Sequence, residues 1–151
     1  MENEKQNENF ENQLTSAAVG FLQESAKWSK FMAIVGFVGI GLMVLVSLFM
    51  AIGFSSMGTA NMPELPFSMS VFSIIYVLFA AIYFFPVYYL YQYATKTSAA
   101  LNSKNKQLLT DGLENLKSHH KFLGIFTLIL VSLYGFIFVF AILGGILSTL
   151  S

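Results

Sequence analysis

The sequence of 151 residues contains no cysteine and no arginine, and only 11% of its residues are charged. Without cysteine, the chain cannot form a disulfide, a thiolate metal site, a thiol nucleophile or a redox motif. Eight Lys balance eight Asp and Glu, so the net charge is zero and no strongly basic face is available for nucleic-acid phosphates. We therefore expect no nucleic-acid partner.

Hydrophobic residues make up 56% of the chain, and the mean hydropathy is +0.66. About 25% of the residues of a typical soluble domain are charged, so this composition indicates an integral membrane protein. Charged residues are absent from three long runs, which cover residues 31–54, 67–93 and 122–147. Each run exceeds the roughly 20 helical residues that cross a bilayer core about 30 Å thick.

Buried β-strands are the competing interpretation of these runs, because Val, Ile, Phe and Tyr are frequent in them. Strands usually have about 3 to 10 residues, and the runs contain no turn signals. The alternating segments of about ten residues that form a membrane barrel are also absent. Segments in lipid must satisfy their own backbone hydrogen bonds. We therefore predict an all-α integral membrane protein with three transmembrane helices.

The distribution of Lys predicts the orientation of the three helices. All eight Lys either precede the first run or lie between the second and the third, whereas residues 55–66 and 148–151 contain none. By the positive-inside rule, the N-terminus and the second connection are cytoplasmic, and the first connection and the C-terminus face outside. The first run is too long for the apolar region of a cleaved signal peptide, so we expect an uncleaved anchor.

The segment before the first run has two parts. Residues 1–13 contain four Glu, four Asn and one aromatic residue, which predicts a disordered tail in front of a single membrane domain over residues 14–151. From Leu14 to Trp28, apolar residues recur at helical spacing. This stretch either lies on the cytoplasmic leaflet as an amphipathic helix or extends the first span. The extension is the simpler interpretation.

The second connection predicts an amphipathic cytoplasmic helix over residues 103–121, which runs directly into the third span. Asn102 or Ser103 is the expected N-cap of this helix. If the second span continues past residue 93, the two helices form a hairpin that extends into the cytoplasm. Gly112 indicates either a close helix crossing or a bend, and the sequence does not choose between them.

Aromatic side chains gather where the spans meet the cytoplasmic side, as is typical of residues at headgroup depth. An aromatic ligand pocket is the alternative. Within the second span, Pro86 removes a backbone donor and is expected to kink the helix. The expected membrane-interface anchors are Trp28, Tyr88, Tyr89, Tyr91 and Tyr93.

Small residues in the first and third spans are candidates for helix packing. Ala141 and Gly145 have the spacing that allows two membrane helices to approach closely, and Gly36 and Gly39 are one residue short of it. These residues predict contacts either within the three helices or between copies of the chain.

Residues with chemical reactivity are scarce. Adjacent His119 and His120 project about 100° apart on a helix, so we expect interfacial residues and not a metal site, with a pH-sensing role chemically open. The three runs contain no charged residue or His, which disfavours a solute carrier. We find no catalytic constellation, phosphate-binding loop or small-molecule site, and we predict a protein that is not an enzyme and needs no cofactor.

Two segments carry a resemblance to a known family. Residues 84–101, FFPVYYLYQYATKTSAAL, and residues 108–125, LLTDGLENLKSHHKFLGI, resemble a family of small bacterial integral membrane proteins that share a domain of unknown function. The shared features are the Pro followed by Tyr-Leu, the Leu-patterned helix and the Lys-x-x-x-Lys-Phe-Leu-Gly-Ile motif. The resemblance implies the cytoplasmic membrane of a bacterium and supplies no catalytic residues.

Three functional hypotheses remain open after these exclusions. The favoured one is a non-enzymatic accessory, scaffold or assembly subunit, which contacts a membrane-protein partner or a second copy of itself through its spans and cytoplasmic hairpin. The second is a component of a small oligomeric channel or transporter, suggested by Pro86 and the hydroxyl groups of the spans. The third is a lipid- or stress-responsive protein that uses residues 10–28 as its sensor.

Overall fold

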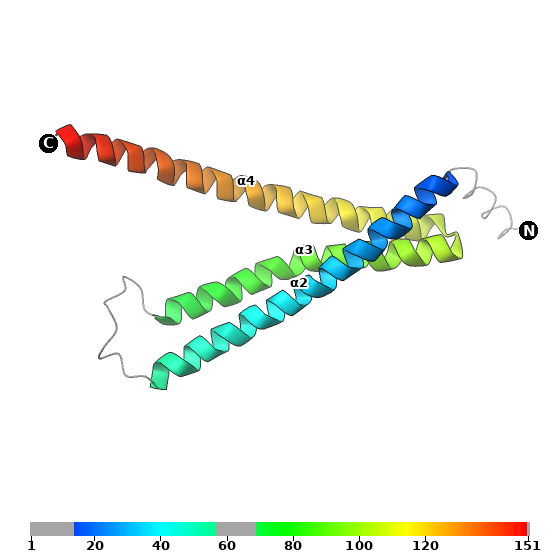
Figure 1. The fold of residues 1–151 in the computed structure, drawn as a ribbon, viewed down its shortest axis with the longest axis horizontal. Coiled ribbons are helices and arrows are strands. Elements are labelled where there is room, and N and C mark those ends of the chain that lie inside the picture. The colour runs from blue at the N-terminus through cyan, green and yellow to red at the C-terminus, as the bar shows by residue number, and fades with distance from the viewer. Residues whose placement is uncertain (1–13, 57–68, 151) are drawn as a thin grey trace, which may run out of the picture.

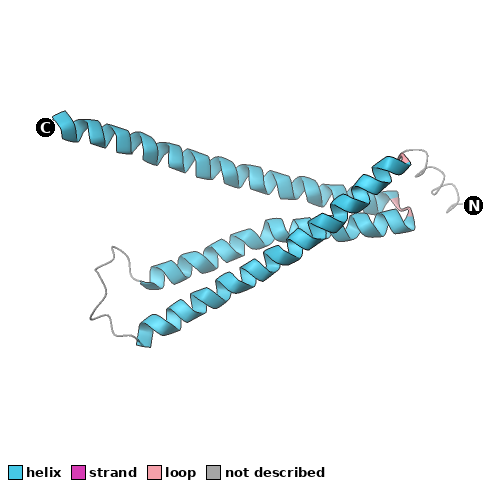
Figure 2. Cartoon of the chain, in the orientation of Figure 1, coloured by secondary structure: helices cyan, strands magenta, loops and turns pink. Residues whose placement is uncertain are grey.

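The computed structural model describes residues 14–56 and 69–150, which form three long helices (Figure 1). These are α2 (Ser16–Ser56), α3 (Met69–Ser103) and α4 (Lys106–Leu150). No strand occurs in the two described ranges (Figure 2). Each helix is long and apolar enough to cross a membrane. The all-α prediction with three candidate membrane spans is therefore confirmed, and the predicted tail and residues 57–66 of the first connection lie outside the described residues.

All three helices are longer than the uncharged runs that predicted them. They contain 41, 35 and 45 residues, which correspond to about 62, 53 and 68 Å at a rise of about 1.5 Å per residue. The hydrocarbon core of a bilayer is only about 30 Å thick. Each helix therefore has a substantial part that a membrane would leave uncovered.

The segment before the first uncharged run belongs to α2, so the extension interpretation is the one that the structure adopts. Helix α2 begins where the Thr15 hydroxyl accepts a hydrogen bond of 3.2 Å from the backbone N–H of Ala18. This contact satisfies one of the backbone donors that the first helical turn leaves unpaired.

A two-residue turn joins α3 to α4, and its residues differ from those predicted. Asn102 and Ser103 form the last turn of α3, so the N-cap prediction is wrong. Lys104 has a φ of 50°, a left-handed conformation that stops α3. Asn105 is the actual cap, because its side-chain oxygen accepts a hydrogen bond of 3.1 Å from the N–H of Leu108. From there α4 runs without interruption to Leu150, so the expected cytoplasmic helix and third span are one helix.

Helix α3 packs against both α2 and α4. The helices converge at the end that contains the start of α2 and the α3–α4 turn, and α4 diverges from the other two toward its C-terminus (Figure 1). Small side chains dominate the buried core, which allows close helix approach. The buried hydrophobic residues are Ala26, Ala33, Ala80, Val87, Tyr93, Ala94 and Ala100.

The C-terminal part of α4 has no such core. Every residue from 131 to 146 is exposed, including large apolar side chains such as Phe138, which is 67% exposed. We call residues 131–146 the α4 arm. In water this surface would be unfavourable, whereas in lipid an apolar helix satisfies its backbone hydrogen bonds internally and needs no protein cover.

Candidate functional site at the polar end

The charged residues of the described chain gather where the three helices converge (Figure 1). We call this region the polar end and define it as residues 16–36 of α2 together with residues 84–122, which comprise the last part of α3, the turn and the first part of α4. It contains seven Lys and three carboxylates, which give a net charge of +4. The Lys residues are Lys27, Lys30, Lys96, Lys104, Lys106, Lys117 and Lys121, and the acidic residues are Glu24, Asp111 and Glu114.

On each helix, one Lys is the charged residue that borders the uncharged part. Lys30 is the last charged residue of α2, Lys96 is the first of α3 and Lys121 is the last of α4. Placing the membrane boundary near these residues leaves residues 106–121 of α4 outside the hydrocarbon, a length of about 24 Å at a rise of about 1.5 Å per residue. The polar end is therefore built to stand in water or among lipid headgroups.

A hydrogen bond between side chains joins α2 to α3 within the polar end. The hydroxyl groups of Ser25 and Tyr93 lie 3.0 Å apart, and Tyr93 is only 1% exposed. Tyr93 was expected to anchor the chain at the membrane interface, but the structure places its ring between two helices. The sequence analysis missed Ser25, and the small residues Ala26 and Ala33, spaced by two helical turns, are the signal that this face of α2 is packed.

The candidate packing residues separate into two groups. Gly36 lies against α3, since a Cβ added to it would come within 2.8 Å of a methyl group of Val87. A Cβ added to Gly39 or Gly145 would meet nothing within 4 Å, and Ala141 is exposed on the α4 arm. Within the described chain, the structure therefore places Gly36 alone among these four residues at a tight helix contact.

Gly112 lies at a close crossing of α3 and α4, which decides between the two interpretations left open above. A Cβ at Gly112 would lie 2.6 Å from the Thr97 hydroxyl oxygen and 3.2 Å from the Thr97 backbone nitrogen. Thr97 itself is fully buried, and its hydroxyl has no hydrogen-bond partner among the described residues. An unpaired buried hydroxyl is energetically costly, so this crossing is both tight and imperfectly satisfied.

A second contact between α3 and α4 involves His119 and Pro86. The ring Nδ1 of His119 lies 2.7 Å from the carbonyl oxygen of Pro86. A carbonyl can only accept, so Nδ1 carries the proton and donates it. The ring of His120 is directed to its own helix, with Nδ1 2.9 Å from the carbonyl oxygen of Leu116. The sequence analysis treated the two histidines alike and missed the cross-helix role of His119.

The two rings of the histidine pair therefore contact different helices. Their centroids are 5.5 Å apart with the planes nearly perpendicular. In the part of the chain that the structure describes, no three His, Asp or Glu side chains are grouped as metal ligands. The Pro86 side chain is buried among the helices, and α3 remains helical through it.

The other expected anchors lie on or near the surface of the polar end. Trp28 is 59% exposed and meets Phe31 edge to face. Tyr88 is exposed, and its hydroxyl oxygen accepts a hydrogen bond of 2.8 Å from the Gln92 amide nitrogen. Tyr89 and Tyr91 are half-buried. An anchoring role for these four residues stays a prediction.

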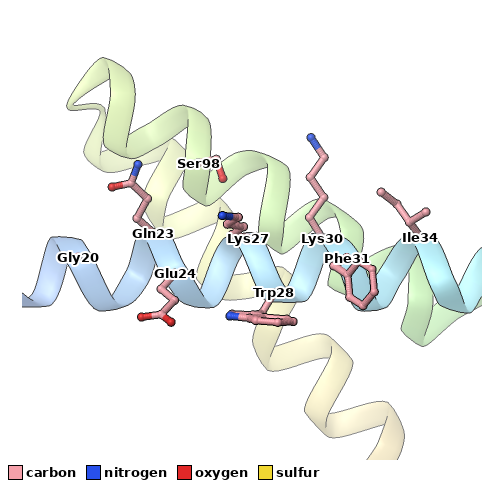
Figure 3. A pocket seen from close by; sticks show the side chains of 9 residues that line it. All are labelled: Gly20, Gln23, Glu24, Lys27, Trp28, Lys30, Phe31, Ile34 and Ser98. Atoms are coloured by element: carbon pink, nitrogen blue, oxygen red, sulfur yellow. The ribbon is translucent and has the colours of Figure 1, made fainter.

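A shallow groove of about 1140 Å³ runs along α2 in the polar end and reaches the last turns of α3 (Figure 3). Lysine side chains and apolar side chains share its wall. The lining residues are Gly20, Gln23, Glu24, Lys27, Trp28, Lys30, Phe31, Ile34 and Ser98.

Comparison with known proteins adds no relative to this description. No family model matches the chain, and no curated protein and no solved structure matches it significantly. The resemblance to small bacterial membrane proteins stays a prediction.

Proposed function

We propose that this chain is a non-enzymatic multi-pass protein of the bacterial cytoplasmic membrane, and that it serves as an accessory, scaffold or assembly subunit. One observation carries the proposal: the polar end is packed by contacts among all three helices, whereas the α4 arm is exposed from residue 131 to residue 146. A helix that leaves its own bundle offers its whole circumference to lipid or to another membrane protein.

The proposed orientation has the start of α2 and the α3–α4 turn in the cytoplasm and the C-terminus outside. The seven Lys of the polar end support it, because cytoplasmic connections carry an excess of Lys and Arg. Reporter fusions test the orientation at Asn102 and Ser151. A reporter that is active only outside the membrane should work at Ser151 and fail at Asn102. The reverse pattern would invert the proposal.

The partner surface has two parts. The α4 arm carries Ala141 and Gly145, whose spacing lets a second helix pack closely against the backbone. The N-terminal part of α4 adds an exposed charged surface, on which Lys117 and Glu114 form an ion pair of 3.7 Å. Such exposed pairs contribute little to stability, about 0 to 1 kcal/mol, so they are free to exchange for contacts with a partner.

Site-specific photo-crosslinking in native membranes tests the partner proposal. A crosslinker at Phe138 of the α4 arm should give a discrete protein adduct, identified by mass as a second copy or another membrane protein. The matched control is Leu45 of α2, which is 50% exposed in a span that already packs against α3. Adducts with lipid only, at both positions, would refute a protein partner on the arm.

A pore formed by several copies is the second candidate, and the exposed hydroxyl of Tyr134 in the α4 arm is the observation that favours it. Two hydroxyls of the other helices are hydrogen-bonded to backbone: Ser73 donates to the Ser47 carbonyl oxygen at 3.1 Å, and Ser47 donates to the Val44 carbonyl oxygen at 2.7 Å. Ion or solute flux through liposomes containing the purified chain would support the pore. Absence of flux in every oligomeric state would exclude it.

A further inference from the structure

The groove along α2 is lined by both cationic and apolar side chains. Lys27, Lys30 and Ile34 line it at spacings of three and four residues, so they lie on one face of the helix. Figure 3 shows the Lys30 side chain extending from α2 to the side on which Ser98 of α3 lies, and the Lys27 side chain nearly end-on. The groove thus has cationic groups on α2 and a hydroxyl group on α3.

The chemistry changes along the axis of α2. Lys27 and Lys30 come first, and Phe31 and Ile34 follow toward the uncharged span, with exposed fractions of 58% and 48%. From residue 27 to residue 34 the helix advances about 10 Å at a rise of about 1.5 Å per residue. Over this short distance the wall passes from charged to apolar, and the change falls at the membrane boundary placed near Lys30.

Within the described ranges, the two Lys ammonium groups form no ion pair. Among the described residues, no carboxylate lies at ion-pair distance from Lys27 or Lys30, in contrast to the 3.7 Å pair of Lys117 and Glu114. Glu24 also lines the groove, three residues before Lys27, and opposes anion binding there, whereas its side chain and that of Lys30 leave α2 on opposite sides (Figure 3). The groove therefore has a net charge of +1, with its cations together.

We propose that this groove binds an anionic phospholipid of the cytoplasmic leaflet. The Lys27 and Lys30 ammonium groups and the Ser98 hydroxyl face the phosphate-containing headgroup, and an acyl chain lies along Phe31 and Ile34. A free phosphate ion would use the first part of the groove only. The apolar continuation of the wall favours a ligand that joins an anion to a hydrocarbon chain. The inference rests on the membrane location proposed above but not on any protein partner.

Trp28 lines the groove and is the only Trp of the chain, so its fluorescence reports on the site without an added label. The purified full-length chain is reconstituted into phosphatidylcholine liposomes that contain a minor fraction of phosphatidylglycerol. Bromine on the acyl chains of one lipid or the other quenches Trp28 when that lipid is adjacent. At equal molar fractions, we expect brominated phosphatidylglycerol to be preferred about fivefold or more, since each Lys near an anionic lipid surface contributes about a fivefold factor.

Two charge variants give the matched comparison. Lys27→Gln with Lys30→Gln should reduce the preference to about onefold, because the remaining groove has no cation to favour an anionic headgroup over a zwitterionic one. Lys104→Gln with Lys106→Gln removes the same charge at the α3–α4 turn and should keep the preference. Lys27→Arg with Lys30→Arg should keep it as well, which separates loss of charge from loss of fold.

Each other outcome has a defined meaning. Equal quenching by both lipids in the unmodified chain would refute the lipid site while leaving the membrane location intact. An equal loss in the turn variant would also refute it, because the preference would then reflect general surface charge. If added inorganic phosphate abolished the preference for phosphatidylglycerol, the groove would be a site for free anions, and the lipid assignment would be wrong. Absence of quenching by any brominated lipid would remove Trp28 from the membrane boundary and contradict the proposed location itself.

Discussion

The two halves of α4 have different surroundings although they belong to one helix. Residues 106–122 contact α3 through Gly112 and His119, whereas residues 131–146 are exposed throughout. The N-terminal half is held by specific side-chain contacts, as in a soluble helical hairpin. The α4 arm depends on its own backbone hydrogen bonds and on an apolar surrounding. One helix is therefore packed against a neighbour at one end and exposed at the other.

Because of this difference, we expect substitutions in the two regions to affect the free energy of unfolding differently. A change in the polar end should alter the free energy of unfolding, because it disturbs contacts that the folded chain makes with itself. An equivalent change in the α4 arm should leave that free energy nearly unchanged and act only on lipid or partner contacts. Pairs of matched variants, one in each region, can break or sharpen the comparison.

The largest effect is expected for truncation of Tyr93. Tyr93→Ala removes a fully buried ring and leaves the Ser25 hydroxyl without its partner, which should lower the free energy of unfolding by about 3 to 5 kcal/mol. Phe138→Ala truncates a ring that is 67% exposed in the α4 arm and should cost little. Thermal unfolding in mild detergent, followed by circular dichroism, measures both. Equal melting temperatures for the two variants would contradict the packed core of the polar end.

The next effect concerns two glycines of the same helix. Gly112→Leu forces side-chain atoms against the Thr97 hydroxyl and backbone, so we expect a loss of about 1 to 3 kcal/mol from overpacking. Gly135→Leu places the same side chain where nothing lies within 4 Å, and it gains helix propensity of up to about 1 kcal/mol. The two substitutions should shift the melting temperature in opposite directions. A stabilising Gly112→Leu would mean that α3 and α4 separate freely at this crossing.

Much of this architecture could be predicted from the sequence, because lipid imposes strong constraints on composition. Uncharged runs of 24 or more residues predict helices that are long and apolar enough to cross a membrane, and Lys lies near one end of each run. Gly36 was identified as a packing residue because close approach requires a small side chain. The helical start of α2 also followed from the periodicity between Leu14 and Trp28.

The contacts between helices could not be predicted in the same way. Tyr93 differs from Tyr91 only in the direction of its side chain, and that direction depends on the rotation of α3 against α2. His119 and His120 are adjacent in sequence, yet only the ring of His119 reaches another helix. The N-cap was misplaced by two or three residues, because Asn102, Ser103 and Asn105 are all good capping residues and the end of α3 decided among them.

A smaller effect, of opposite sign, is expected at Thr97. Its buried hydroxyl has no partner among the described residues, so Thr97→Val removes an unsatisfied polar atom at nearly constant volume. We expect the free energy of unfolding to rise by about 1 kcal/mol. The control is Thr95→Val one half-turn away, where the hydroxyl donates to the Tyr91 carbonyl oxygen at 2.7 Å and its loss should be neutral or slightly unfavourable. Destabilisation by Thr97→Val alone would show that the hydroxyl does have a partner, such as a buried water.

The smallest effect is expected at the histidine pair, at the point where α3 and α4 begin to diverge. His119→Phe keeps a ring of similar size but removes the donor to the Pro86 carbonyl, and hydrogen bonds between membrane helices average about 0.6 kcal/mol. His120→Phe removes only a bond within α4 and serves as the control. Because so small a change is hard to see in global unfolding, amide hydrogen exchange near residues 86–90 is the better measurement. Faster exchange in His119→Phe but not in His120→Phe would indicate that this single bond limits local opening of the hairpin. If the two variants exchange alike, the His119 hydrogen bond does not limit local opening. The packing of Phe85 against Phe122, whose ring centroids are 6.5 Å apart, would then hold α3 and α4 together here.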